Sequence, residues 1–153
     1  AAGTMHLLGF GTWMGTVLYT TFIAGLTMYK NLPRKTFGKL QSKLFPQYFM
    51  LSSICILLQI VTLPLLGLSK TSSNALYVAL AMTLVNQFYL EPVSTKTMFA
   101  RYELEDAGDK ESSKYKKLAA NFGKYHGMSS LTNLIGLIGG FVHAVFLGAS
   151  LVA

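Results

Sequence analysis

Long stretches without charge constrain this chain more than any other feature of its sequence. Residues 5–29 contain no Asp, Glu, Lys or Arg, and as a helix these 25 residues would be about 37 Å long, enough to cross a bilayer. In lipid every backbone polar group needs an internal partner, which favours helices. The sequence therefore predicts an all-α integral membrane protein, a bundle of four transmembrane helices in one domain. The predicted spans are 5–29, 47–68, 75–90 and 129–152 of the single domain 1–153.

The composition agrees with a membrane protein. Only 12% of the residues are charged and 52% are hydrophobic, whereas soluble domains carry about 25% charged residues. The net charge of +7 would fit nucleic-acid binding if the lysines covered a soluble fold. Here the basic residues flank apolar stretches, so membrane lipids are the expected partners and nucleic acid is not.

Basic residues are concentrated in two of the three connections. Five lie in residues 30–46 and seven in residues 91–128, whereas Lys70 alone lies between the second and third predicted spans. Because cytoplasmic loops carry an excess of Lys and Arg, we expect both basic connections to be cytoplasmic. Both termini would then be lumenal or extracellular.

The first basic connection has helical periodicity. Phe37, Leu40 and Leu44 recur at helical spacing, and Lys39 and Lys43 share one face. This pattern predicts a short amphipathic helix in the headgroup region, with its lysines near anionic lipid. The alternative is an ordinary loop whose charge only sets topology. The residues expected to contact lipid or a partner are Arg34, Lys35, Lys39, Lys43, Lys116 and Lys117.

The second basic connection predicts two further helices. Pro92 lacks a backbone donor and disfavours helix at Glu91, so we expect a break or kink there. Residues 93–105 can form a helix that ends at 107–109. Ser113 is a plausible N-cap for the next helix, which would lie on the bilayer or pack under the bundle.

Polar residues near the ends of the third and fourth spans form a candidate membrane cluster. Its members are Asn86, Glu91, His126 and Asn133. An ionisable group in a membrane segment marks an ion or proton path by default, and this is the functional interpretation. The structural alternative is that Glu91 pairs with Lys43 or caps a helix.

Two histidines lie in the outer half of the bundle. His6 on the first span and His143 on the fourth are placed to ligate haem from facing helices, or to make polar contacts between helices. Neither belongs to a ligand motif, so no metal site and no cofactor is predicted. The chain also has no nucleophile elbow, phosphate loop or zinc spacing, which argues against an enzyme.

Small residues recur at four-residue spacing and predict close helix packing. They are Gly11, Gly15, Gly136, Gly140, Ala144 and Gly148. Such a face suits either packing inside one monomer or the seam of a homo-oligomer.

Three blocks carry a resemblance to a known family. They are LPRKTFGKLQSKLFPQYF (32–49), NQFYLEP with Thr95 and Met98 after it (86–98), and KYKKLAANFGKYHGMSSLTNL (114–134). Together they resemble the transmembrane protein 205 family. The resemblance implies a four-span protein of a eukaryotic endomembrane or plasma membrane, without an established activity, whose functional side is cytoplasmic.

Three functions remain open at this point. The first is a non-enzymatic scaffold or interaction protein whose basic cytoplasmic face contacts anionic lipid or a partner. The second is a small oligomeric transporter or channel-like protein with a polar passage. The third is a cofactor-binding redox membrane protein.

Overall fold

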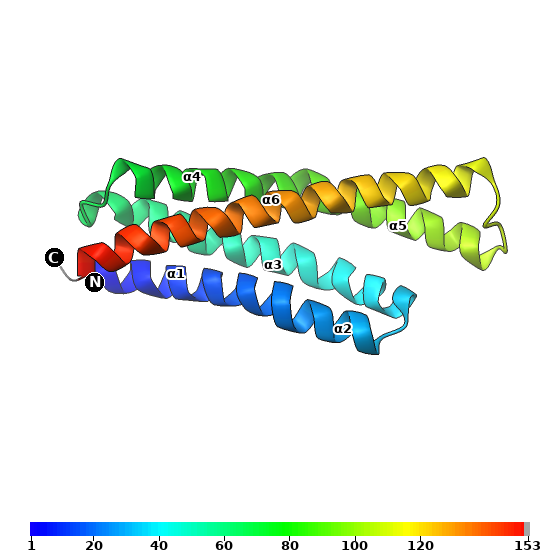
Figure 1. Ribbon diagram of the computed structural model, residues 1–153, viewed down its shortest axis with the longest axis horizontal. Coiled ribbons are helices and arrows are strands. Elements are labelled where there is room, and N and C mark those ends of the chain that lie inside the picture. Colours follow the sequence, from blue (N-terminus) through cyan, green and yellow to red (C-terminus); the bar gives the residue numbers. More distant parts are fainter. Residues whose placement is uncertain (152–153) are drawn as a thin grey trace.

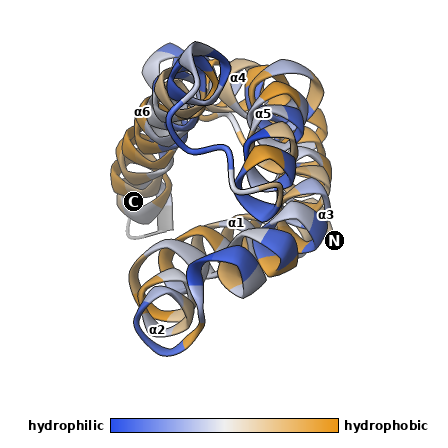
Figure 2. Cartoon of the chain, turned by 90° about the vertical axis from the view of Figure 1, so that its right-hand side faces the viewer, coloured by the Kyte–Doolittle hydropathy of each residue, from blue (hydrophilic) through white to orange (hydrophobic). Residues whose placement is uncertain are grey.

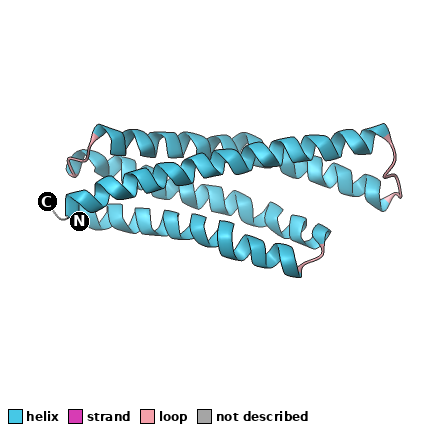
Figure 3. Ribbon diagram, viewed as in Figure 1, coloured by secondary structure: helices cyan, strands magenta, loops and turns pink. Residues whose placement is uncertain are grey.

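The computed structural model describes residues 1–151 as long helices joined by short turns, and no strand occurs in this range (Figures 1 and 3). Residue 152, the last of the fourth predicted span, lies outside the described residues. The elements are α1 Ala2–Leu18, the π-turn η1 Tyr19–Ala24, α2 Gly25–Asn31, α3 Arg34–Thr62, the 3₁₀ turn η2 Leu63–Leu65, α4 Lys70–Val85, the π-turn η3 Asn86–Leu90, α5 Glu91–Asp106 and α6 Ser113–Leu151.

These elements form four helical rods that lie side by side (Figure 1). The first rod is α1–η1–α2, the second α3–η2, the third α4–η3–α5 and the fourth α6. In the first half of the bundle α1 packs on α3, and α6 packs along α4; further on, α6 packs along α5. The α2–α3 turn and the α5–α6 loop lie at one end, which Figure 2 shows facing the viewer. The N-terminus and the α3–α4 turn lie at the opposite end.

The interior and the surface of the bundle are both largely apolar. Trp13, Ile56 and Leu76 are among the fully buried side chains. The outer surface carries large apolar side chains as well, and Val61 and Phe88 are 70% and 72% exposed. An outward apolar surface of this extent is typical of a protein that faces lipid, because exposing so much apolar surface to water is unfavourable.

Three helices are long and apolar enough to cross a membrane. They are Ala2–Asn31, Arg34–Leu65 and Ser113–Ser150. The third predicted span, 75–90, lies in a rod that does not meet the same criterion. The all-helical class is therefore confirmed, with three candidate spans in place of the expected four.

A break or kink was predicted at Glu91 and Pro92, and of these the break does not occur. The third rod continues from α4 through η3 into α5, with Pro92 in the first turn of α5. A proline inside a helix removes one backbone donor and crowds the carbonyl four residues earlier. The wider π-turn immediately before Glu91 lies where this conflict arises, which explains how the rod continues.

Both amphipathic pieces predicted in the connections are parts of longer helices. The basic stretch begins α3, which runs to Thr62 with Pro46 inside it, so there is no separate interfacial helix at 34–46. Likewise α6 has 39 residues, roughly 58 Å at helical rise, against a bilayer core of about 30 Å. Gly108 at φ +77° follows the end of α5 as expected, but Ser112 rather than Ser113 accepts the capping bond from the Tyr115 amide.

The glycines at close helix contacts include Gly140 of the predicted set and others that were not predicted. A Cβ atom at Gly9 would lie 3.1 Å from the Cys55 carbonyl, and one at Gly139 would lie 2.9 Å from the Ala75 carbonyl. Of the predicted positions, Gly140 packs against Met14 and Gly136 lies near α4. By contrast, the Cβ positions of Gly11, Gly15 and Gly148 meet no atom within 4 Å. Ala144 is half-buried.

Candidate solute-binding cavity

A cavity of about 230 Å³ lies between the four rods, in the half of the bundle that leads to the basic connections. Every rod contributes to its wall. The polar lining residues are Thr20, Thr21, Gln41, Ser42, Tyr48, Glu91, Ser94, Thr95, His126, Ser129, Ser130 and Asn133, and the apolar ones include Phe45, Phe49, Met98 and Phe122. No Lys or Arg of the described chain belongs to this wall.

The two π-turns supply or precede important parts of this wall. Thr20 and Thr21 belong to η1, and Glu91 follows η3 directly. A π-turn widens the helix by about one residue, and such turns are frequent at functional sites. Both π-turns therefore occur where the rods surround this cavity.

Among the described residues, Glu91 is the only acidic one in the wall. The residue is only 9% exposed, and its Oε1 atom accepts a hydrogen bond of 2.7 Å from the Thr95 hydroxyl. No ion pair with Lys43 is present in the described structure, so the predicted structural pairing is wrong. One carboxylate oxygen thus has a protein partner, and the group lies at a cavity wall.

The structure brings together three of the four residues of the predicted polar membrane cluster. Glu91, His126 and Asn133 line the same cavity, and the Tyr48 hydroxyl donates to Asn133 Oδ1 at 2.8 Å. Asn86 lies outside the lining. Its amide instead donates to Thr132 Oγ1 at 2.8 Å, tying η3 to α6.

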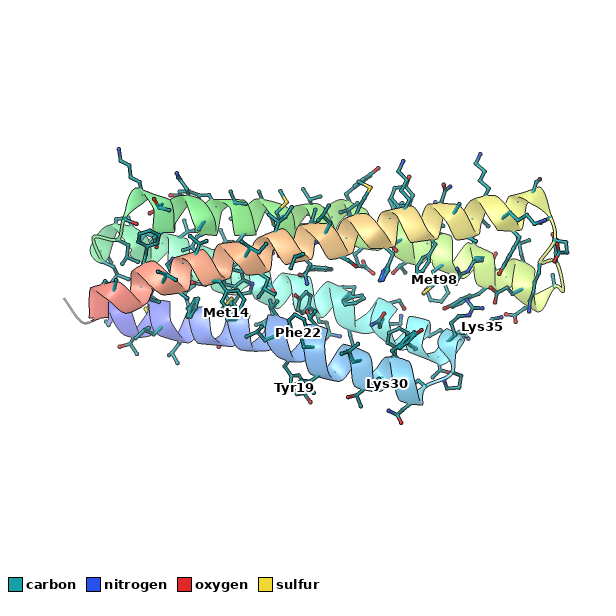
Figure 4. All side chains as sticks on the ribbon, viewed as in Figure 1. Met14, Tyr19, Phe22, Lys30, Lys35 and Met98 are labelled. Carbon is teal, nitrogen blue, oxygen red and sulfur yellow. The ribbon has the colours of Figure 1, made fainter. Side chains whose placement is uncertain are left out.

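A cluster of ion pairs joins the start of α3 to the end of α5. Arg34 donates to Glu105, and Lys35 donates to Asp106. The Tyr102 ring lies beneath both cations, 5.2 Å from the Arg34 guanidinium carbon and 5.5 Å from Lys35 Nζ. Figure 4 labels Lys35 at this end of the molecule. Arg34 and Lys35, predicted to contact lipid or a partner, therefore bind acidic side chains of their own chain.

Glu105 is the centre of this ionic cluster. Its side chain is 3% exposed, and its Oε1 accepts from the Tyr115 hydroxyl at 3.0 Å. Burial raises the pKa of Glu105, but the hydrogen bonds from Arg34 and Tyr115 outweigh burial and hold that pKa below its ordinary value. The hydrogen bond from Lys35 lowers the pKa of Asp106, and the bond to Glu105 raises the pKa of Tyr115.

The other predicted contact residues remain at the surface. Lys39, Lys43 and Lys117 are exposed. Lys116 is also exposed, and its Nζ atom lies 3.4 Å from Glu111 Oε2. Such a surface ion pair contributes little to stability. The lipid-contact prediction thus keeps its geometric basis for these lysines and loses it for Arg34 and Lys35.

His6 and His143 meet at the opposite end of the bundle. Their Nε2 atoms lie 2.9 Å apart and form a hydrogen bond. Because the two nitrogens bond each other, no space is left between them for a haem iron. Sequence reasoning placed both histidines in the same half of the bundle but missed Thr62 and Ser72, which bond the outer ring nitrogens.

The fold and its surface define an all-helical protein of the membrane-protein class. The chain belongs to the family described as "Domain of unknown function (DUF4149)", whose model matches residues 8–103. It is 28% identical to "Transmembrane protein 205" of Danio rerio over 96% of this chain and 92% of that protein, which confirms the resemblance seen in the sequence. It is also 39% identical to "Xanthocillin biosynthesis cluster protein D" of Aspergillus fumigatus over 39% of this chain and 38% of that protein. No solved structure matches.

Proposed function

We propose that this chain is a four-span integral membrane protein that binds, and carries across the membrane, a small polar solute with an ammonium or similar cationic group. The cavity would hold the solute, and the Glu91 carboxylate would accept its positive charge. The third rod would cross the membrane with the other three. Its lower hydropathy fits this role, because polar residues in a span face the bundle interior or a cavity.

The observation that carries the proposal is the chemistry of the cavity wall. Hydroxyl and amide groups share the described wall with one carboxylate and the His126 imidazole, and no Lys or Arg belongs to it. Such a wall offers many hydrogen-bond acceptors to a donor-rich solute and would repel an anion through Glu91. Ligand cavities usually measure about 300–1,000 Å³, so a cavity of about 230 Å³ favours a solute of few atoms.

The test is a calorimetric titration of the protein in lipid nanodiscs with three probes of similar size: ethylammonium, acetamide and acetate. We expect ethylammonium to bind best and Glu91→Gln to weaken it at least about tenfold, or ~1.4 kcal/mol. Glu103→Gln is the matched control, because Glu103 is an exposed carboxylate on the same helix. Preference for acetate, or equal binding by Glu91→Gln, would refute the proposal.

Transport is tested separately from binding. In proteoliposomes, uptake of labelled ethylammonium is expected to depend on the protein and to fall in Glu91→Gln, while Glu103→Gln behaves as wild type. Binding without uptake would retain the solute site and reject the passage.

A second candidate function is a scaffold with a basic face toward anionic lipid. The exposed side chains of Lys39, Lys43 and Lys117 support it, since each lysine near an anionic leaflet contributes about 1 kcal/mol. Native mass spectrometry after extraction from phosphatidylserine bilayers tests this role. The Lys39→Gln/Lys43→Gln double variant should retain less phosphatidylserine than wild type, whereas Lys70→Gln, at the other end of the bundle, should not.

The same spectra test the homo-oligomer. Gly11 and Gly15 on α1 are exposed and have open space at their Cβ positions. They therefore remain available for the predicted seam between copies. A monomer that retains lipid would rule out the interface between copies and would support the lipid-binding face.

A further inference from the structure

A hydrogen-bonded chain of four side chains crosses the core near the end of the bundle that holds the N-terminus and the α3–α4 turn. His6 Nδ1 lies 2.7 Å from Thr62 Oγ1, the two Nε2 atoms lie 2.9 Å apart, and His143 Nδ1 lies 2.7 Å from Ser72 Oγ. The four residues come from α1, α3, α6 and α4, so the chain joins all four rods. His6, His143 and Ser72 have no exposed surface, and Thr62 is 3% exposed.

The proton positions follow from the outer partner on α3. Thr62 Oγ1 lies 2.9 Å from the Gln59 carbonyl and 3.0 Å from the Leu58 carbonyl, so its hydroxyl hydrogen is donated to the backbone. Its oxygen must then accept from His6 Nδ1–H, which leaves His6 Nε2 as an acceptor. His143 Nε2–H therefore donates to His6, and His143 Nδ1 accepts from the Ser72 hydroxyl. Both rings are neutral in this arrangement, and each ring nitrogen has one bond.

This arrangement has one place for an added proton. A proton on His143 Nδ1 needs only a rotation of the Ser72 hydroxyl, whose oxygen then accepts from the new N–H. The hydrogen between the two Nε2 atoms stays in its bond and stabilises the imidazolium by a charge-assisted contact. A second proton would place two N–H groups head to head across 2.9 Å and would break the contact between α1 and α6.

The described groups that contact the two histidine rings carry no charge, so proton binding depends on the pair itself. The Phe10 ring of α1 packs on His143 with ring centroids 5.6 Å apart. On α3 and α4 the contacting groups are the hydroxyls of Thr62 and Ser72, and Lys70, two residues before Ser72, is exposed. Within residues 1–151 no acidic side chain bonds either ring.

We propose that His6 and His143 form a one-proton binding site in the core of the bundle, with Thr62 and Ser72 as the outer hydrogen-bond partners. The site holds one added proton shared by two rings and rejects a second while the helices stay in contact. It goes beyond the proposed function of the cavity, because it uses other residues at the other end of the molecule and stands whether or not the cavity binds a solute.

The test is nitrogen NMR of histidine-labelled protein in nanodiscs, in a His126→Gln background. The chain has three histidines, so this variant leaves only the pair and does not alter it. The titration runs from about pH 8 to about pH 4, on both sides of the ordinary imidazole pKa of about 6.5. We expect both rings to shift together, with uptake of one proton per chain, and a scalar coupling between the two Nε2 nuclei.

Each other result overturns the proposal. Uptake of two protons at independent midpoints would mean that the rings do not share a site. No uptake before unfolding would leave the pair a neutral tie between helices. Absence of the Nε2–Nε2 coupling would remove the bond on which the site depends. The further variant His143→Gln should abolish the joint transition, and loss of folding in that variant leaves the His126→Gln titration as the deciding result.

Discussion

Arg34, in the first turn of α3, donates a hydrogen bond to Glu105, near the end of α5 and 71 residues later in the chain. The contact fastens the beginning of the second rod to the end of the third. It uses basic residues whose sequence context pointed to lipid. The charge of the first connection is therefore partly neutralised within the molecule by Glu105 and Asp106.

Glu105→Gln should destabilise the protein. The change removes the charge that Arg34 and Lys35 share, while it leaves their positive charges close together. Arg34 is 54% exposed, and solvent screening reduces the loss to about 1–3 kcal/mol. Denaturant titration in mixed micelles measures it, with Glu103→Gln as the exposed control on the same helix. Equal stability of the two variants would show that the cluster contributes nothing.

The ionic cluster also predicts a loss of stability in acid. The pKa values of Glu105 and Asp106 are lowered in the folded protein. Groups of this kind bind protons more weakly when folded, so their contribution is complete above the ordinary carboxyl pKa of about 4 and is lost as pH falls through the lowered values. The thermal midpoint of wild type should decline below about pH 4, and that of Glu105→Gln should decline less. Parallel pH profiles would contradict this assignment.

Gly139→Ala should weaken the contact between α6 and α4. The new Cβ would lie 2.9 Å from the Ala75 carbonyl, and a backbone atom cannot move aside as a flexible side chain can. Overpacking costs about 1–3 kcal/mol, against which alanine gains about 1 kcal/mol of helix propensity over glycine. Gly148→Ala, in open space on the same helix, should be neutral or stabilising. Chemical denaturation compares the two variants, and the prediction fails if Gly139→Ala is the more stable one.

The proposed four-span arrangement predicts that the two ends of the bundle lie on opposite sides of the membrane. Single cysteines at Lys70 and Lys117, each in a Cys55→Ser background, should react with an impermeant maleimide from opposite faces of sealed vesicles. By the positive-inside rule the Lys117 side should be cytoplasmic. Labelling of both positions from one face would mean that one rod does not cross.

Much of the architecture was predictable because helical periodicity and charge are local properties of the chain. The charge pattern put both basic connections on one side, and the span boundaries put Glu91, His126 and Asn133 near the span ends on that side. The cavity that they line follows from that placement. The sequence could not reveal that Arg34 would bind Glu105, because the pairing depends on how far α5 extends beside α3.

Other features depend on packing that a single sequence does not encode visibly. His6 and His143 were expected in the same half of the bundle, but their direct bond depends on the rotation of α1 against α6. The close glycines were predicted only in part for the same reason: Gly140 packs against Met14, whereas Gly11 and Gly15 fit the small-residue motif but Gly9 is the residue that faces α3. Pro92 was interpreted as a break or kink because propensity describes a regular helix and does not anticipate a π-turn ahead of it.

The π-turn η3 lets the third rod carry one extra residue without a change in helical phase. A π-turn closes its hydrogen bond over five residues where a regular helix uses four, so it takes up the extra residue in about the same rotation. Removing one residue from Asn86–Leu90 to restore a regular helix would therefore leave Ser94, Met98, Tyr102 and Glu105 facing the neighbours against which they are now buried. Such a deletion should keep the packing of α5 and remove only the widened turn ahead of Glu91, so the extra residue serves the cavity wall and not the register of the rod.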